Sequence, residues 1–205
     1  MAYIQRNLEK VVEQVTKEYP VVLVTGPRQV GKTTMLKKLM EGSSRGYVSL
    51  DDLNDRALAK NDPELFLQLH KPPVLIDEVQ YAPELFTYIK VYADTHQEPG
   101  VFWLTGSQVF KLMRGVQESL AGRVAVLSMT PLSQSELNGA EVEPFRVDLE
   151  ALLKRENQSK PVDTKGIFER IYRGSMPAIA SGKNTNSQIF YSSYLSTYIE
   201  RDVKE

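Results

Sequence analysis

The chain has 205 residues, of which 41% are hydrophobic and 25% are charged, and it carries a formal net charge of −1 with no cysteine. This composition is ordinary for a globular protein and excludes disulfide and thiol chemistry. The overall charge does not support a nucleic-acid partner, the amino terminus lacks the apolar core of a signal peptide, and no apolar run approaches the roughly 20 residues of a membrane helix. We therefore expect a cytoplasmic protein with no membrane contact.

Five short apolar runs, rich in β-branched or aromatic residues, predict buried strands at residues 21–25, 47–51, 73–77, 101–105 and 124–128. Each is nearly continuous in apolar residues, as strands covered on both faces are. Helical patterns lie between them: one ends at Gly42, and another has Asp62 as its N-cap and Pro63 at its first position. This alternation predicts an α/β fold with a parallel sheet flanked by helices.

The pattern changes after about residue 130, so we predict a core over residues 1–135, a polar and partly helical excursion over 136–165, and a helical segment over 166–205. In the last helix, an apolar strip is predicted at spacings of three and four residues: Tyr191, Tyr194, Leu195 and Tyr198. The chain then ends at "YIERDVKE" without a capping residue. We expect a fragment of a longer protein; the alternative is a frayed terminal helix.

The stretch "GPRQVGKT" matches the phosphate-loop pattern G-x-x-x-x-G-K-[ST] directly after a predicted strand and before a predicted helix. In such a loop, glycines turn backbone N–H groups inward around phosphate oxygens, the lysine reaches the β- and γ-phosphates, and the threonine hydroxyl binds Mg²⁺. The sequence therefore predicts ATP binding by Gly26, Pro27, Arg28, Gln29, Val30, Gly31, Lys32, Thr33 and Thr34.

A second motif, "PPVLIDEVQ", places two carboxylates at the end of the third predicted strand. An aspartate at this end of a parallel strand lies beside the phosphate loop, so Asp77 is predicted to hold Mg²⁺ together with Thr33. Glu78 is predicted to orient and polarise the attacking water as a general base. The alternative is an acidic pair that caps the following segment.

A third motif, "FWLTGSQ", ends the fourth predicted strand in polar residues. A hydroxyl at this strand tip can contact the γ-phosphate and report its presence, and the sequence does not separate Thr105 from Ser107 for this role. The alternative is ordinary turn chemistry, because Thr, Gly and Ser favour turns.

The motifs "GPRQVGKTT", "LIDEVQYAPELF", "LTGSQ" and "LAGRVAVLSMTPLSQSE" together resemble AAA+-like P-loop ATPases. More narrowly, they resemble prokaryotic ATP-binding proteins in which an AAA-type domain precedes a C-terminal domain related to restriction-type nucleases. The resemblance covers essentially the whole chain. It implies a five-stranded parallel sheet in the order 5-1-4-3-2 and a C-terminal domain that would begin where this chain stops.

Two arginines are softer candidates. In the AAA+-like family an arginine near Arg123 often reaches into a neighbouring subunit's nucleotide site, which would require a homo-oligomer; the alternative is a surface arginine paired with a carboxylate. The segment "YIQRN" is a candidate for contact with adenine, through Ile4 as an apolar contact and Arg6 as a polar one, and the alternative is a segment that leads into the first helix.

Three functions compete. The leading prediction is a Mg²⁺-dependent ATPase whose nucleotide cycle drives or regulates an attached domain or partner. The second is a nucleotide-gated switch with little turnover. The third is a small-molecule kinase, which Glu78 disfavours because a kinase needs no water-activating carboxylate beside the metal ligand. A GTPase is disfavoured because the base-reading pattern N/T-K-x-D is absent from the sequence.

Overall fold

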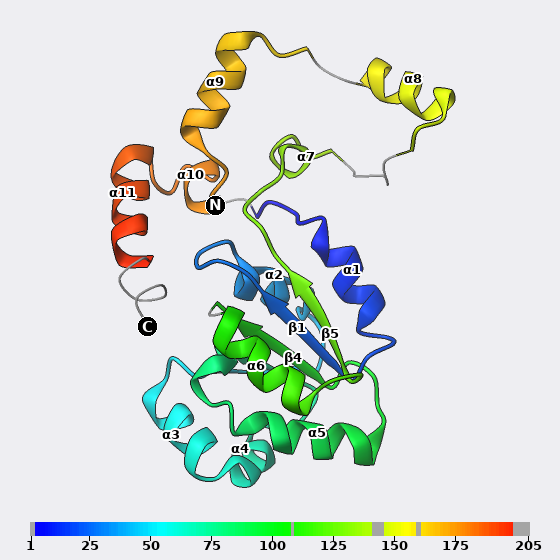
Figure 1. The fold of residues 1–205 in the computed structure, drawn as a ribbon, viewed down its shortest axis with the longest axis vertical. Coiled ribbons are helices and arrows are strands. Elements are labelled where there is room, and N and C mark those ends of the chain that lie inside the picture. Colours follow the sequence, from blue (N-terminus) through cyan, green and yellow to red (C-terminus); the bar gives the residue numbers. More distant parts are fainter. Residues whose placement is uncertain (1–2, 108, 141–145, 159–160, 199–205) are drawn as a thin grey trace. The chain divides into compact units, whose positions relative to one another are not determined.

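A parallel five-stranded sheet organises the first of two compact units, Leu8–Thr130 (Figure 1). The computed structural model describes residues 3–107, 109–140, 146–158 and 161–198. All strand pairs are parallel and their order is β2-β3-β4-β1-β5, which confirms the predicted order. The strands are β1 (Val21–Thr25), β2 (Gly46–Ser49), β3 (Val74–Asp77), β4 (Phe102–Gly106) and β5 (Val124–Ser128).

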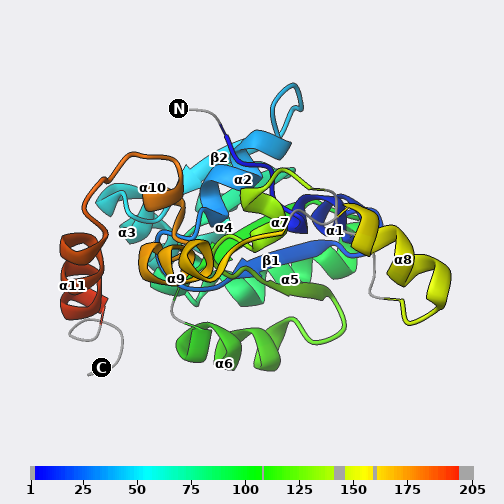
Figure 2. The same cartoon turned by 90° about the horizontal axis from the view of Figure 1, so that it is seen from above.

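Helices cover both faces of this sheet. Figure 2 shows α1 and α2 on one face and α5 and α6 on the other. The helices of this unit are α1 (Leu8–Val15), α2 (Lys32–Leu39), α3 (Leu53–Asn61), α4 (Pro63–Leu69), α5 (Leu85–His96) and α6 (Val109–Ser119), with a 3₁₀ turn η1 (Val79–Tyr81) after β3. This layering explains the apolar strands, since both faces of a doubly covered parallel sheet are buried.

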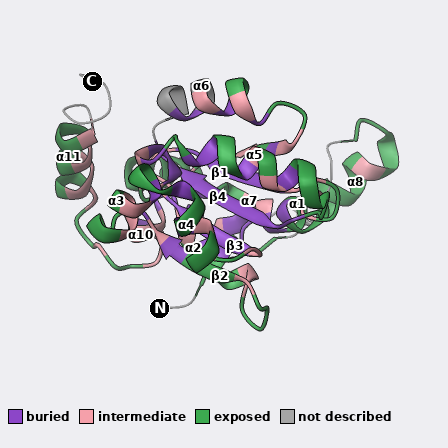
Figure 3. Cartoon of the chain, turned by 90° about the horizontal axis from the view of Figure 1, so that it is seen from below, coloured by how far each residue is buried: buried purple, intermediate pink, exposed green. Residues whose placement is uncertain are grey.

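The core of the unit lies on both faces of the sheet, because successive side chains of a strand point to opposite faces. Every residue of β1, β3 and β4 is buried (Figure 3). Leu23, Ile76 and Leu104 belong to one apolar cluster with residues of α5 and α6. Side chains of the intervening strand positions point to the opposite face, where α1 and α2 lie. The three central strands are thus fixed from both sides, which holds their carboxyl ends rigidly.

Most predicted boundaries agree with the structure, with local differences. Asp62 accepts a hydrogen bond from the Leu65 N–H, and Pro63 begins α4, as predicted. Strand β2 ends at Ser49, two residues earlier than predicted, because Leu50 is buried as part of a turn. An apolar residue in the sequence predicts burial, but it does not by itself predict backbone hydrogen bonds to a neighbouring strand. Helix α2 ends at Leu39, before Gly42.

The second compact unit joins Met1–Asn7 with Pro131–Glu205. Its helices are α7 (Gln134–Leu137), α8 (Leu149–Gln158), α9 (Thr164–Arg173), α10 (Pro177–Ala180) and α11 (Ser187–Tyr198). Ser133 and Glu136 form a reciprocal capping box at the start of α7. Residues 199–205 of the predicted final helix lie outside the described residues. The division at residues 135 and 165 stays a prediction.

A buried ion pair attaches the amino-terminal segment to α7 within this second unit. Glu136 accepts hydrogen bonds from Arg6 Nε at 3.0 Å, from the Asn7 N–H at 2.8 Å and from the Ser133 N–H at 2.7 Å. Burial opposes the charge on Glu136, but the Ser133 and Asn7 N–H groups and the Arg6 guanidinium outweigh it and lower its pKa. Arg6 therefore anchors the amino-terminal segment to α7, and a contact of this segment with adenine stays a prediction.

None of the helices in the described part of the chain combines the length and the apolar character that a membrane crossing requires.

Candidate functional site

The phosphate loop connects β1 to α2, and its two fixed glycines are required by the backbone. Gly26 has φ +143°, and a Cβ there would lie 2.2 Å from the carbonyl oxygen of Met129. Gly31 has φ 98° and is the left-handed N-cap of α2. Other residues would be strained at both positions. The N-terminus of α2 therefore opens into the loop, where its N–H groups favour an anion.

The remaining loop residues divide by exposure. Lys32 is 5% exposed, and its Nζ donates hydrogen bonds to the carbonyl oxygens of Gly26 at 3.0 Å and Pro27 at 2.9 Å. Val30 is fully buried beneath the loop, and Gln29 adopts φ 61°. The exposed members are Gln29 and Thr34, whereas Pro27, Arg28 and Thr33 are half-buried. Lys32 is thus hydrogen-bonded to the loop that the motif predicts to bind phosphate.

Asp77 ends β3 beside the start of α2, where the sequence predicts it. The hydroxyl of Thr33 donates to Asp77 Oδ1 at 2.7 Å, and the Tyr47 hydroxyl donates to Oδ2 at 3.2 Å. The Asp77 side chain is only 6% exposed. The two predicted metal ligands are therefore in direct contact although 44 residues separate them in sequence. Tyr47 in this contact was not predicted, because nothing local in "GYVSL" indicates its partner.

Thr105 fixes the backbone that carries both carboxylates. It is completely buried, its hydroxyl donates to Asp77 Oδ1, and its oxygen accepts the Glu78 N–H at 3.0 Å. Glu78 has φ 56° and ψ 46°, a left-handed conformation that costs a residue with a Cβ roughly 1–2 kcal/mol. The bond to Thr105 helps to hold this strained turn.

The Glu78 carboxylate is held by two donors. Ser107 Oγ donates to Glu78 Oε2 at 3.2 Å, and Gln80 Nε2 donates to the same oxygen. Ser107 is 3% exposed and Gln80 is 9% exposed. The structure therefore separates two residues that the sequence does not distinguish: Thr105 contacts Asp77 and the backbone, and Ser107 contacts Glu78. Gln80 was missed, although it lies within the quoted motif "IDEVQ".

The sheet topology explains why these side chains meet. Strand β4 lies between β3 and β1, and Val24 of β1 is in register with Thr105. The carboxyl ends of parallel strands share one edge, so residues after β1, β3 and β4 converge there. Lys32, Thr33, Asp77, Glu78, Thr105 and Ser107 consequently form one constellation at the sheet edge.

Arg123 does not join this constellation in its own chain. It precedes β5 at the opposite, amino-terminal edge of the sheet, and its guanidinium forms an ion pair with Asp94 of α5 in which Nη2 lies 3.0 Å from Oδ2. The hydrogen bond from Arg123 lowers the pKa of the Asp94 carboxyl, and Asp94 raises that of Arg123. The alternative predicted for this residue, a surface pair, is thus present; a role in a neighbouring subunit stays a prediction.

The donor set at Asp77 fits magnesium. Among the residues that the structure describes, no group of three or more His, Cys, Asp and Glu side chains gathers as a metal cluster. Mg²⁺ does not need one, since it is usually bound by one or two protein oxygens and completed by water and substrate phosphates. The adjoining hydroxyl of Thr33 and carboxylate of Asp77 supply such oxygens.

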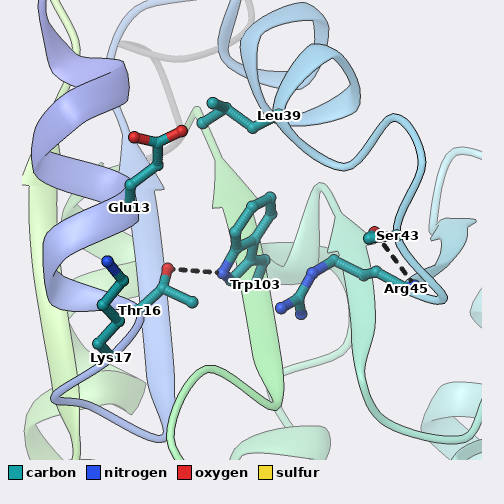
Figure 4. Close-up of a pocket in the computed structure, with 7 residues that line it drawn as sticks. All are labelled: Glu13, Thr16, Lys17, Leu39, Ser43, Arg45 and Trp103. Carbon is teal, nitrogen blue, oxygen red and sulfur yellow. Dashed lines mark hydrogen bonds between the residues drawn. The ribbon is translucent and has the colours of Figure 1, made fainter.

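A separate cavity of about 470 Å³ lies between α1, the loop before β2, and β4 (Figure 4). Trp103 donates from Nε1 to Thr16 Oγ1 at 3.0 Å, and the Arg45 guanidinium lies 4.0 Å from the centre of the Trp103 ring. Arg45 also donates to the Gly100 carbonyl at 2.7 Å, and burial lowers its pKa to about 10. These contacts attach α1 and the loop to the amino-terminal half of the sheet, away from the phosphate loop.

The topology, the glycine-shaped loop and the carboxylates at the sheet edge define a P-loop ATPase fold. Solved structures agree: the Walker-type ATPase of Pyrococcus abyssi has a TM-score of 0.56 at 17% identity, covering 95% of this chain and 72% of that one. AMPPCP-bound DnaA from Aquifex aeolicus has a TM-score of 0.50 at 14% identity, covering 86% of this chain and 57% of that one. At these identities the likeness shows the fold alone.

A family model described as "AAA domain" matches residues 18–138, more than half of the chain. The chain therefore belongs to the AAA domain family, and the expected AAA+-like P-loop ATPase is confirmed. Family and fold together support nucleotide binding of the ATPase kind.

Among curated proteins, uncharacterized proteins of Mycobacterium tuberculosis and Mycobacterium bovis are each 31% identical over 188 residues, 91% of this chain. The chain spans only 36% of the length of these relatives. The predicted nuclease-like C-terminal domain stays a prediction.

Proposed function

We propose that this chain is a Mg²⁺-dependent ATPase domain whose nucleotide cycle drives or regulates an attached domain or partner. The observation that carries the proposal is the contact between Thr33 and Asp77 with Glu78 directly after it. This arrangement places the two candidate metal ligands and a candidate base at one edge of the sheet. A phosphate loop without these groups would support binding alone.

In this proposal each residue of the site has a separate role, set by its charge and position. Lys32 exchanges its contacts with the loop carbonyls for oxygens of the β- and γ-phosphates when ATP binds. Thr33 and Asp77 would hold Mg²⁺, which would neutralise charge that develops on the phosphates. Glu78 accepts a proton from the attacking water, and Ser107, in contact with Glu78, senses the γ-phosphate. Each assignment follows from the charge and position of the side chain.

A nucleotide-gated switch with little turnover is the second candidate. In this candidate the two hydrogen bonds to Glu78 Oε2 stabilise the charged form of the carboxylate enough that it activates water poorly, whereas in an ATPase the second oxygen, Oε1, still accepts the proton. Steady-state phosphate release with ATP alone separates the two: an ATPase turns over repeatedly, whereas a switch stops near one phosphate per chain. A phosphorylated small-molecule acceptor would instead reveal a kinase.

Two substitutions test the assignments. Lys32→Ala removes a contact made to the bound phosphates, so nucleotide binding should fall below detection. Glu78→Gln should preserve nucleotide affinity and lower turnover about 10²- to 10⁴-fold, because the carboxylate acts mainly on the transition state. Fluorescent-nucleotide titration and phosphate release measure the two effects. Wild-type turnover in Glu78→Gln would show that the base assignment is wrong.

A further inference from the structure

We infer that Gln80 is a positioning residue that fixes the Glu78 carboxylate through its side-chain amide. The inference rests on the proposed ATPase function and adds a residue to which the phosphate-loop mechanism gives no role. Gln80 lies two residues after Glu78 in the 3₁₀ turn η1, and its side chain is buried. Its amide Nε2 donates to Glu78 Oε2.

The orientation of the Gln80 amide is set by chemistry. With the amide turned over, Oε1 would face the Glu78 carboxylate, and two acceptors would repel each other; only Nε2 can make this contact. The turn therefore presents a donor to the carboxylate. Gln80 Oε1 then becomes a buried acceptor without a hydrogen-bond partner in the described structure. An unsatisfied buried acceptor destabilises a fold, so the contact with Glu78 is kept at a cost to stability.

The fold makes room for this amide at the tip of β4. A Cβ on Gly106 would lie 2.7 Å from Gln80 Oε1 and 2.6 Å from Leu112 Cδ1. Glycine at this position thus permits the amide to reach Glu78. Gly106 directly precedes Ser107, the second donor to the carboxylate, so both donors depend on the end of β4.

Both donors bind the same oxygen of the Glu78 carboxylate, which leaves the other oxygen for the water. Gln80 and Ser107 bond to Oε2, while the left-handed backbone and its bond to Thr105 fix the base of the side chain. With Oε2 held, Oε1 is the oxygen that accepts the proton of the water. Gln80 acts through Glu78, to which its amide donates.

The test uses two variants that remove the contact in different ways. Gln80→Leu deletes the amide at similar size, and Gly106→Ala keeps Gln80 but displaces its amide. Both should lower kcat at least about tenfold with the KM for ATP within about twofold. In a Glu78→Gln background, Gln80→Leu should cause no further loss. Gly115→Ala is the matched control: its Cβ would meet the Phe86 ring at 2.7 Å, a similar steric load in α6, and kcat should be unchanged.

The outcomes separate the two proposals. Wild-type kcat in both Gln80→Leu and Gly106→Ala, with turnover lowered about 10²- to 10⁴-fold in Glu78→Gln, would overturn the positioning role alone. A further loss from Gln80→Leu in the Glu78→Gln background would also overturn it, since Gln80 would then act independently of Glu78. Absence of turnover in the wild type would overturn the ATPase proposal and this inference with it. Thermal unfolding of each variant checks that lost activity is not lost fold.

Discussion

The sheet of Leu8–Thr130 and the helices that follow Pro131 bury their residues to very different extents. Every residue of β1, β3 and β4 is buried, whereas α9 and α11 contain no buried residue. Phe168, Ile171 and Tyr172 of α9 are 65%, 69% and 72% exposed. Burial of apolar surface supplies most of the favourable free energy of folding. We therefore expect the sheet, which carries the candidate site, to have a higher local free energy of unfolding than α9 and α11.

Amide hydrogen exchange should show this contrast most strongly. Amides of β4 can exchange only when the sheet unfolds, whereas those of α11 exchange by local fraying. With a global stability of at least about 5 kcal/mol, the rates should differ by at least roughly 10³-fold. Mass-spectrometric exchange on peptides covering residues 101–107 and 187–198 measures the ratio. Equal protection in both peptides would show that α11 is as firmly packed as the sheet.

A matched pair of leucine substitutions tests the same contrast energetically. Leu104 is fully buried in β4, and Leu195 is 54% exposed on α11. Leu104→Ala should lower the free energy of unfolding by about 2–5 kcal/mol through lost burial and a cavity, whereas Leu195→Ala should change it by less than about 0.5 kcal/mol. Urea unfolding followed by circular dichroism gives both values. A large loss from Leu195→Ala would mean that the strip on α11 is packed.

The Arg6–Glu136 pair contrasts with α9 and α11 within the second unit, since it is buried and densely hydrogen-bonded. Glu136→Gln should destabilise this unit by about 1–3 kcal/mol, because it removes the charge that three donors contact. The folded pKa of Glu136 is lowered, so its contribution is present above the unfolded value of about 4.3 and is lost as pH falls through the folded pKa.

The difference between wild type and Glu136→Gln in thermal unfolding should therefore be full near neutral pH and should shrink in strongly acidic solution. Ser135→Ala is the comparison in the same helix: the half-buried Ser135 hydroxyl contacts Asn7 Nδ2 and Ser133 Oγ, so its loss removes neutral hydrogen bonds and should carry no such pH dependence. A difference that grows as the pH falls would contradict the assignment of Glu136 as the charged partner.

The sequence predicted those parts of the site that depend on local geometry. The phosphate loop could be recognised because its fixed residues fall within eight consecutive positions. Asp77 could be recognised because an apolar strand ends there. The Arg6–Glu136 contact was not predictable, because its partners lie 130 residues apart and the local capping pattern at Glu136 says nothing about Arg6. Gln80 was missed for a different reason. The nearby Glu78 can be recognised from its motif, but the burial of the Gln80 side chain and its contact with Glu78 depend on the 3₁₀ turn and on Gly106.

Arg123 gives the smallest expected effect, because the Asp94 partner that it contacts is on the surface. Exposed ion pairs contribute little to stability, so Arg123→Ala and Asp94→Ala should both leave thermal unfolding nearly unchanged. If the pair is the whole role of Arg123, ATPase activity per subunit should also be the same in Arg123→Ala and constant on dilution. Phosphate release measured across a range of protein concentrations tests both statements.

A trans role would contradict this expectation in a specific way. An arginine supplied by a neighbour accelerates GTPases by roughly 10³- to 10⁵-fold, so even a small part of that effect would be visible. Activity per subunit would rise with concentration, and Arg123→Ala would flatten the rise while leaving ATP affinity unchanged, since the residue would act on the transition state. Mixing Arg123→Ala with Glu78→Gln chains is the sharper measurement: in a shared site, an intact Glu78 of one chain meets an intact Arg123 of another, and activity partly returns. A mixture that stays inactive, together with constant wild-type activity on dilution, leaves Arg123 as the surface partner of Asp94.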